Sequence, residues 1–145
     1  QEAVGLIEFS SEVRETVPLA PLSQNRAALQ QAIAGLTASG ETALLDAVDA
    51  AYTRLQKRGE TDRINAIVVM TDGLENHSKI KLATLERRLR EGNRAGPPVI
   101  IFCIAYGQDA DYATLQRIAD ATGGQVRAGS LETIQELYKI MSSYF

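Results

Sequence analysis

Two runs of apolar, mostly β-branched residues constrain the fold of this chain more than any other feature. The first, INAIVVMT, extends from Ile64 to Thr71, and the second, VIIFCIA, extends from Val99 to Ala105. Both are too continuously apolar for strands that expose one face to water, so we expect strands covered on both faces, as in a parallel sheet. Pro97 and Pro98 stand just before the second run, which agrees with a strand that begins there.

Segments with helical periodicity separate these strands. Apolar residues recur three or four positions apart, which predicts helices whose apolar faces pack on the sheet. The predicted helices are Asn25–Leu36 with Leu29, Ile33 and Leu36 on one face, Ala43–Arg58, a helix marked by Leu82, Leu85 and Leu89 that ends within Gly92–Gly96, Asp111–Thr122, and a last helix marked by Leu131, Ile134, Leu137, Tyr138 and Met141.

The start of the chain has a different pattern. Two short apolar runs, Ala3–Ser10 and Glu12–Val17, predict a hairpin that Pro18 and Pro21 bring to an end. A short strand, Gln125–Arg127, follows the glycines that end the helix Asp111–Thr122. Alternating strands and helices predict one α/β domain over residues 1–145, with a Rossmann-like, mostly parallel sheet, helices on both faces and an antiparallel edge hairpin.

Composition excludes several classes of function. The 145 residues carry a net charge of -3, which gives no electrostatic footprint for nucleic acid, and Arg87, Arg88 and Arg90 are expected on the solvated face of a helix. No apolar run approaches the ~18 residues of a membrane-spanning helix. Cys103 and His77 are each the only residue of their type, so the two cannot build a zinc site by themselves.

Thr71-Asp72-Gly73 places a carboxylate at the end of the first buried run. Ligands of such sheets bind outside the carboxyl ends of the strands, so Asp72 is a candidate metal ligand. The alternative is a tight turn in which the carboxylate of Asp72 bonds to its own backbone.

Gly40-Glu41-Thr42 stands just before the predicted helix Ala43–Arg58. The hydroxyl of Thr42 could face the same rim of the sheet as Asp72 and supply a second oxygen ligand. The alternative is an ordinary helix N-cap, in which the hydroxyl accepts a hydrogen bond from the first turn.

In this order, the segments resemble the von Willebrand factor type A domain. The similar segments are VGLIEFSSEV at Val4–Val13 (second and third strands of the family), GETALLDAV at Gly40–Val48 (a helix start beside a metal loop), IVVMTDGLEN at Ile67–Asn76 (fourth strand and metal loop) and IFCIAYG at Ile101–Gly107 (fifth strand). In that family, an Asp-x-Ser-x-Ser loop, a threonine and an aspartate, often within Thr-Asp-Gly, bind Mg²⁺, Mn²⁺ or Ca²⁺. The resemblance implies that the metal ligands are Thr42 and Asp72, and that the partner-binding rim is Gly40, Glu41, Gly73, Glu75, Asn76 and His77.

One departure from the family pattern matters. Nothing here matches the family's central first strand, its Asp-x-Ser-x-Ser loop or its first helix. A hard cation takes about six oxygen ligands, so we expect weak or absent Mg²⁺ binding by Thr42 and Asp72 alone. Each unpaired backbone group in the resulting gap would cost about 1–3 kcal/mol. The flanking strands are therefore expected to close the gap directly, or to pair with another chain as a homodimer or by strand swapping.

The remaining polar candidates are expected to have structural roles. Cys103 lies in a buried strand and is interpreted as a small core residue rather than a nucleophile. Asp109 and Asp111 most simply cap the next helix. Asp46 and Asp49 are interpreted as solvated charges on a helix surface.

Three functions of different classes follow from these observations. The first is a non-catalytic binding module, in which a bound metal keeps one position open for a carboxylate of a protein partner. The second is a purely structural module of a larger protein, with no metal. The third is a Mg²⁺-dependent hydrolase that uses Asp72, but the phosphate-binding and nucleophile motifs of such enzymes are absent and His77 is the only histidine.

His77 could also touch a partner or a metal. The alanine- and arginine-rich, lysine-poor composition favours a bacterial source.

Overall fold

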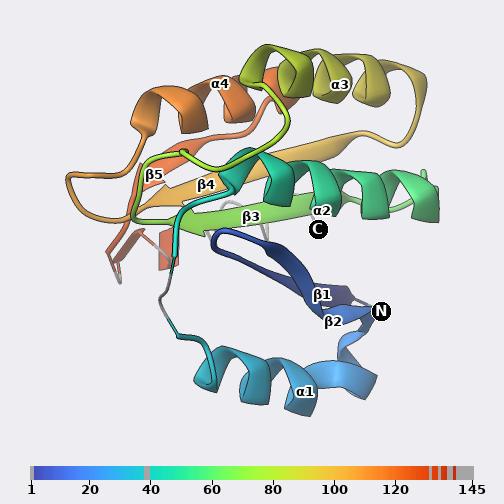
Figure 1. Ribbon diagram of the computed structural model, residues 1–145. Coiled ribbons are helices and arrows are strands. Elements are labelled where there is room, and N and C mark those ends of the chain that lie inside the picture. The colour runs from blue at the N-terminus through green and yellow to red at the C-terminus, as the bar shows by residue number, and fades with distance from the viewer. Residues whose placement is uncertain (1, 38–39, 131, 134, 137–138, 140–145) are drawn as a thin grey trace.

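Three parallel strands form the central sheet, in the order β3 (Asn65–Thr71), β4 (Val99–Ala105) and β5 (Val126–Ala128) (Figure 1). The computed structural model describes residues 2–37, 40–130, 132–133, 135–136 and 139. β3 and β4 pair along their whole length, so the two apolar runs are neighbouring parallel strands, as predicted. β5 lies one residue later than the sequence indicated.

Three helices cover one face of this sheet: α2 (Leu44–Arg58), α3 (Leu82–Ala95) and α4 (Tyr112–Thr122) (Figure 1). The layer between them is the main core, and its fully buried side chains include Leu44, Leu85, Leu89, Val99, Ile101, Cys103, Leu115 and Ile118. Burial of an aliphatic side chain of this size stabilises the fold by about 1.5–3 kcal/mol. This layer therefore fixes the positions of the strand ends that carry the candidate site.

The opposite face of the sheet is covered unevenly. Phe102 and Ile104 of β4 are only 2% and 3% exposed, whereas Val68 and Met70 of β3 are 41% and 50% exposed. The expectation that both apolar runs form strands covered on both faces is therefore wrong for β3 and right for β4. The reason is position: β4 lies between two strands, whereas β3 is at the edge of the three-stranded sheet.

The antiparallel hairpin is formed by β1 (Ala3–Phe9) and β2 (Val13–Pro21). The second strand continues through Pro18, where the sequence analysis ended it. A register irregularity between Val4 and Leu6 of β1 lies opposite this segment, and irregularities of this kind accommodate a residue without a backbone N–H.

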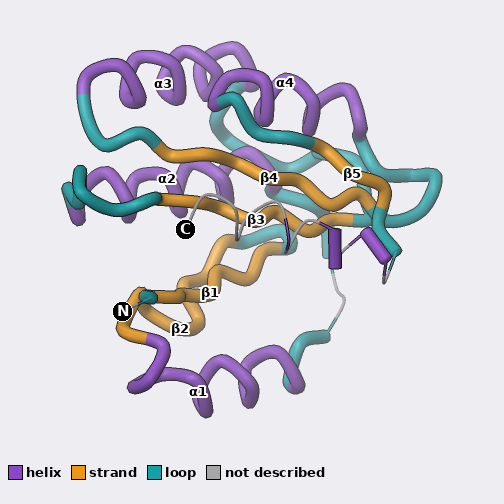
Figure 2. Tube along the Cα trace, turned by 180° about the vertical axis from the view of Figure 1, so that it is seen from behind, coloured by secondary structure: helices purple, strands orange, loops and turns teal. Residues whose placement is uncertain are grey.

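Helix α1 (Leu22–Ala34) packs on the side of the hairpin away from the parallel sheet (Figures 1 and 2). It begins three residues before the predicted Asn25 and ends before Leu36. Of the predicted apolar face, only Leu29 is buried, and Ile33 and Leu36 are 57% and 48% exposed. Buried Asn25 holds α1 to the hairpin, since its Nδ2 donates to the carbonyl of Val4 at 2.7 Å.

The hairpin and the parallel sheet remain two separate sheets. The expectation that the flanking strands close the gap directly is wrong, because β1 and β3 do not pair within the described ranges. The hairpin is instead held at its turn, where the N–H of Ala43 donates to the carbonyl of Ser10 at 2.7 Å. An ion pair between Arg54 of α2 and Glu15 of β2, 2.8 Å long, is a second contact between the hairpin and the rest of the domain.

Helix α3 ends at Ala95 with Gly96 as its C-cap, within the predicted range Gly92–Gly96, and Gly92 lies in its last turn. A Cβ at this position would come within 2.2 Å of the hydroxyl oxygen of Tyr52, which donates to Asn93 Oδ1 at 3.0 Å. Gly92 therefore permits close packing of α3 on α2.

Two further predictions concern membrane-spanning helices and the last helix of the chain. No helix among the described residues has the length and apolar character needed to cross a membrane. The residues that mark the predicted last helix, Leu131, Ile134, Leu137, Tyr138 and Met141, lie outside the described residues.

Candidate functional site

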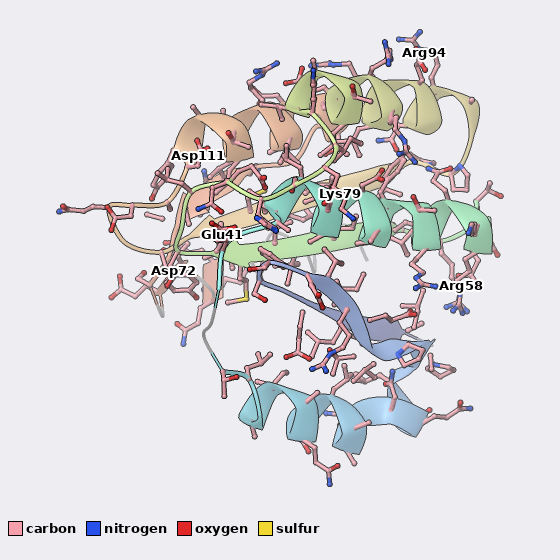
Figure 3. All side chains as sticks on the ribbon, in the orientation of Figure 1. Glu41, Arg58, Asp72, Lys79, Arg94 and Asp111 are labelled. Atoms are coloured by element: carbon pink, nitrogen blue, oxygen red, sulfur yellow. The ribbon has the colours of Figure 1, made fainter. Side chains whose placement is uncertain are left out.

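The site lies where β3 ends, as expected for a parallel sheet. Figure 3 places Glu41, Asp72 and Asp111 at one end of the sheet and Arg58 at the opposite end. Asp72 is exposed, and within the described part of the chain its carboxylate has no hydrogen-bond or ion-pair partner. The turn instead contains a long contact of 3.4 Å from the N–H of Gly73 to the hydroxyl of Thr71. The alternative in which Asp72 bonds to its own backbone is therefore not found.

Thr42 lies directly against the loop that carries Asp72. Its Oγ1 is 3.2 Å from the position that a Cβ on Gly73 would occupy. The N-cap of α2 is Ala43 and no side chain of its own segment caps it, so Thr42 is not the helix cap that the sequence also allowed. Thr42 thus lies against the residue that follows Asp72, and neither Thr42 nor Asp72 has the structural role proposed as its alternative.

The side chain of Glu75 caps the N-terminus of α2, although 30 residues separate it from Leu45 in the sequence. Its Oε2 accepts from the N–H of Leu45 at 2.9 Å, and Ser78 Oγ accepts from the N–H of Asp46 at 3.0 Å. Glu75 also accepts from the N–H and hydroxyl of Ser78, at 2.7 and 2.8 Å. A carboxylate at a helix N-terminus interacts favourably with the positive end of the helix dipole. Glu75, expected on the partner-binding rim, therefore has an internal role.

The side chain of Asp46, in the first turn of α2, accepts hydrogen bonds from the segment that follows Ser78. Its two carboxylate oxygens accept from the N–H groups of Lys79 and Ile80, at 2.8 and 3.0 Å. The interpretation of Asp46 as a solvated charge is wrong, because the side chain is half-buried and caps the segment that leads to α3. Asp49 is also half-buried and pairs with Arg88 at 2.9 Å, so it is not simply solvated either.

The loop that carries Thr42 is held on its other side by the hairpin turn. Ser11 Oγ accepts from the N–H of Glu41 at 2.9 Å and would be 2.6 Å from a Cβ on Gly40, whose φ of 72° also favours glycine. Glu41 in turn forms an ion pair with Nδ1 of His77. The sequence analysis missed Ser11 and Ser78, because their partners lie about thirty residues away and no local motif marks them.

The oxygen atoms at this site meet only part of the needs of a hard cation. Among the described residues, no group of three or more His, Cys, Asp or Glu side chains is arranged to hold a metal. Thr42 and Asp72 offer one hydroxyl and one carboxylate, against the six or so oxygen ligands that Mg²⁺ takes. A hydroxyl and a carboxylate oxygen are suitable ligands for Mg²⁺, but the site needs further oxygen ligands.

Two other predictions concern the surroundings of the site. Asp111 caps α4 as expected, accepting from the N–H of Thr114 at 3.1 Å, and its own N–H reaches the carbonyl of Gly73 at 3.4 Å. Cys103 is fully buried, and burial raises the pKa of its thiol to about 12. It is a core residue, as interpreted from the sequence.

Comparisons with known proteins agree with this arrangement. The family model of the von Willebrand factor type A domain matches residues 1–141. Inter-alpha-trypsin inhibitor heavy chain H4 of Homo sapiens is 28% identical over 134 residues, which are 88% of this chain and 14% of that protein. The Bos taurus protein of the same description is 29% identical over 129 residues, which are 84% of this chain and 14% of that protein. The chain thus spans 14% of the length of these curated relatives.

Solved structures with the same fold come from bacteria and from a mussel. A von Willebrand factor type A protein from Catenulispora acidiphila superposes with a TM-score of 0.74 at 23% identity, covering 96% of this chain and 32% of that one. BatB from Bacteroides thetaiotaomicron gives 0.75 at 13% identity, covering 98% and 78%. Proximal thread matrix protein 1 of the mussel byssus gives 0.68 at 20% identity, covering 94% and 34%. At these identities the likeness concerns the fold alone. By the match of the family model to nearly its whole length, the chain belongs to the von Willebrand factor type A domain family.

Proposed function

We propose that this domain is a non-catalytic protein-interaction module whose contact surface is centred on Thr42 and Asp72. The observation that carries the proposal is the position of Thr42 Oγ1 against Gly73, the residue after Asp72, while neither Thr42 nor Asp72 has the cap or turn role that would otherwise explain it. Domains of this family typically serve protein–protein interaction or adhesion, which agrees with it.

The proposed contact uses a divalent cation such as Mg²⁺. Asp72 would supply a negatively charged oxygen and Thr42 a neutral one, and an open position on the bound cation would accept a carboxylate of the protein partner. Glu41 and His77 are exposed beside these residues and would contact the partner around that carboxylate. Because Thr42 and Asp72 fill only two of about six positions, this chain is expected to bind Mg²⁺ weakly.

The two competing functions have less support. A hydrolase needs a positioned base, but His77 pairs with Glu41 on the surface and lies on a loop rather than in an enclosed cleft. A purely structural module gives no role to the close approach of Thr42 to the loop that carries Asp72. Turnover of phosphoester substrates would support the hydrolase, and a complete lack of metal binding would support the structural module.

Calorimetric titration with Mn²⁺ and Mg²⁺ tests the proposal. Asp72→Asn should abolish the binding, because it removes the only carboxylate that we assign to the cation. Asp62→Asn is the matched control, since Asp62 is an exposed aspartate that precedes β3 and so lies at its opposite end. If the Asp72 and Asp62 variants lose binding equally, or neither loses any, Thr42 and Asp72 are not the contact.

A second mode of association is supported by the outer edge of β3, which pairs with no other strand in the described part of the chain. The N–H of Tyr106 donates to the carbonyl of Thr71 at 2.9 Å, so the peptide groups of Thr71 face β4. Backbone direction alternates along a strand, and the peptide groups of Ala66, Val68 and Met70 therefore face away from β4. An edge of this kind is a template for pairing with another chain, and we propose a second copy of this chain as that partner.

Light scattering after size-exclusion chromatography tests this pairing. Val68→Lys places a charge on the edge strand and should shift any dimer to monomer. Leu74→Lys is the control, because Leu74 is 57% exposed but lies beyond the strand. A chain that stays monomeric at all concentrations would contradict self-pairing.

A further inference from the structure

Asn76 is an exposed residue that nevertheless contacts both backbone polar groups of Thr42. Its Oδ1 accepts from the N–H of Thr42 at 2.8 Å. Its own N–H donates to the carbonyl of Thr42 at 3.1 Å, and the N–H of His77 reaches the same carbonyl at 3.3 Å. Thr42 is thus held by hydrogen bonds to one short segment, although 34 residues separate it from Asn76.

The segment that carries Asn76 is itself anchored independently. Glu75 and Ser78 accept hydrogen bonds from the first turn of α2, and Asp46 of that turn accepts from the N–H groups that follow Ser78. Hydrogen bonds therefore run in both directions between the start of α2 and residues 75–80. Removing the side chain of Asn76 leaves these contacts intact and deletes only the hydrogen bond that its Oδ1 accepts from the N–H of Thr42.

The position of Thr42 matters because it lies so close to the next loop. Its Oγ1 is in contact range of the Cα region of Gly73, the neighbour of Asp72. A shift of the Thr42 backbone by a fraction of an ångström would move the hydroxyl away from the side on which Asp72 lies. The hydrogen bonds from Asn76 oppose such a shift.

We propose that Asn76 is a positioning residue that fixes Thr42 beside Asp72. The inference rests on the proposed function of these two residues and deepens it. It reassigns the side-chain amide of Asn76 from contact with a partner, the role expected from the sequence, to support of the threonine ligand. Because Asn76 is exposed, its truncation leaves no cavity, so loss of positioning can be separated from loss of the fold.

The experiment compares Asn76→Ala, Asn76→Asp and Lys79→Ala by NMR in the whole chain. Lys79→Ala is the matched control, since Lys79 is an exposed residue of the same segment that bonds to Asp46 through its backbone N–H rather than its side chain. Two readouts need no metal: hydrogen exchange of the Thr42 amide, and the Hα–Hβ coupling that reports the rotamer of its side chain. The third is the affinity for Mn²⁺, measured from the paramagnetic broadening of Thr42 and Asp72.

Asn76→Ala should accelerate exchange of the Thr42 amide and weaken Mn²⁺ binding by about three- to tenfold, the effect of one net hydrogen bond. The Hα–Hβ coupling should move toward a rotamer average, with thermal stability nearly unchanged. Asn76→Asp keeps an acceptor oxygen, so it should restore slow exchange, and Lys79→Ala should resemble the wild type.

Two results would overturn the inference. In the first, the Thr42 amide and coupling in Asn76→Ala equal those of the wild type. In the second, they change as expected but Mn²⁺ affinity does not, which would make Asn76 merely structural. If the wild-type chain shows no Mn²⁺ effect at Thr42 and Asp72, the proposed function fails, whereas the two metal-free readouts still decide whether Asn76 positions Thr42.

Discussion

The hydroxyl oxygen of Thr42 lies 3.2 Å from the point at which a side chain on Gly73 would begin. Few real Cβ atoms approach a neighbour this closely, so the two loops meet because residue 73 is glycine. The φ of Gly73 is not in the left-handed region, and the requirement for glycine here is therefore spatial rather than conformational.

Gly73→Ala should accordingly leave the backbone unstrained but push Thr42 outward by a few tenths of an ångström. We expect a small stability change, within about 1 kcal/mol, together with a clear loss of Mn²⁺ affinity in calorimetry. Gly35→Ala serves as the control, because a Cβ there meets nothing closer than 3.4 Å. Equal Mn²⁺ affinities in the two variants would show that the contact between Thr42 and Gly73 does not matter for binding.

Glu75→Ala should destabilise the domain. The variant leaves the N–H groups of Leu45 and Ser78 without their acceptor, and we expect the free energy of unfolding to fall by about 1–3 kcal/mol in urea titrations. Glu91→Ala, which removes an exposed carboxylate on α3, should change it by less than about 0.5 kcal/mol. A Glu75→Ala protein as stable as the Glu91→Ala protein would refute the capping role.

Glu8 should titrate at lower pH than an ordinary glutamate. A hydrogen bond from Thr16, and then one from Arg14, lower its pKa. A carboxylate with a depressed pKa stabilises the fold above its ordinary pKa, and this contribution is lost as the pH falls through the lowered value. Thr16→Val should therefore raise the pKa of Glu8 in an NMR titration, whereas Thr61→Val, at an exposed position, should not. An unchanged titration in Thr16→Val would contradict this cause.

Cys103 should be inert to alkylating reagents in the folded protein. Its thiol is fully buried, and with a pKa of about 12 it is almost never a thiolate at neutral to mildly alkaline pH. Iodoacetamide labelling followed by mass spectrometry should therefore track global unfolding and speed up with added urea. Rapid labelling without denaturant would mean that β4 opens locally.

The sequence predicted the parallel part of the fold well, because its signals are local. Val99–Ala105 is an unbroken apolar run between Pro98 and a polar turn, and its predicted and observed bounds coincide. The predicted helix ends at Arg58 and Thr122 are also the observed ones, and each is followed by a glycine in the left-handed conformation. These features depend on neighbouring residues alone.

The errors came where distant residues decide the outcome. Val68 is as apolar as its neighbours, and only the order of the strands reveals that it lies on an edge strand and is exposed. Asp46 has the sequence context of a solvated helix residue, and its role as a cap depends on a segment 33 residues away. The pairing of Thr42 with Asn76 is hidden for the same reason, although Thr42 and Asp72 themselves could be selected from short motifs.

The most direct test of the proposed site is a map of Mn²⁺-induced broadening over the amide resonances of the wild-type chain. We predict that broadening begins at Thr42, Asp72 and Gly73, and that Asp72→Asn removes it while Asp62→Asn does not. Broadening that begins at other surface carboxylates, or that is the same in both variants, would contradict the claim that Thr42 and Asp72 act together as the functional centre of this domain.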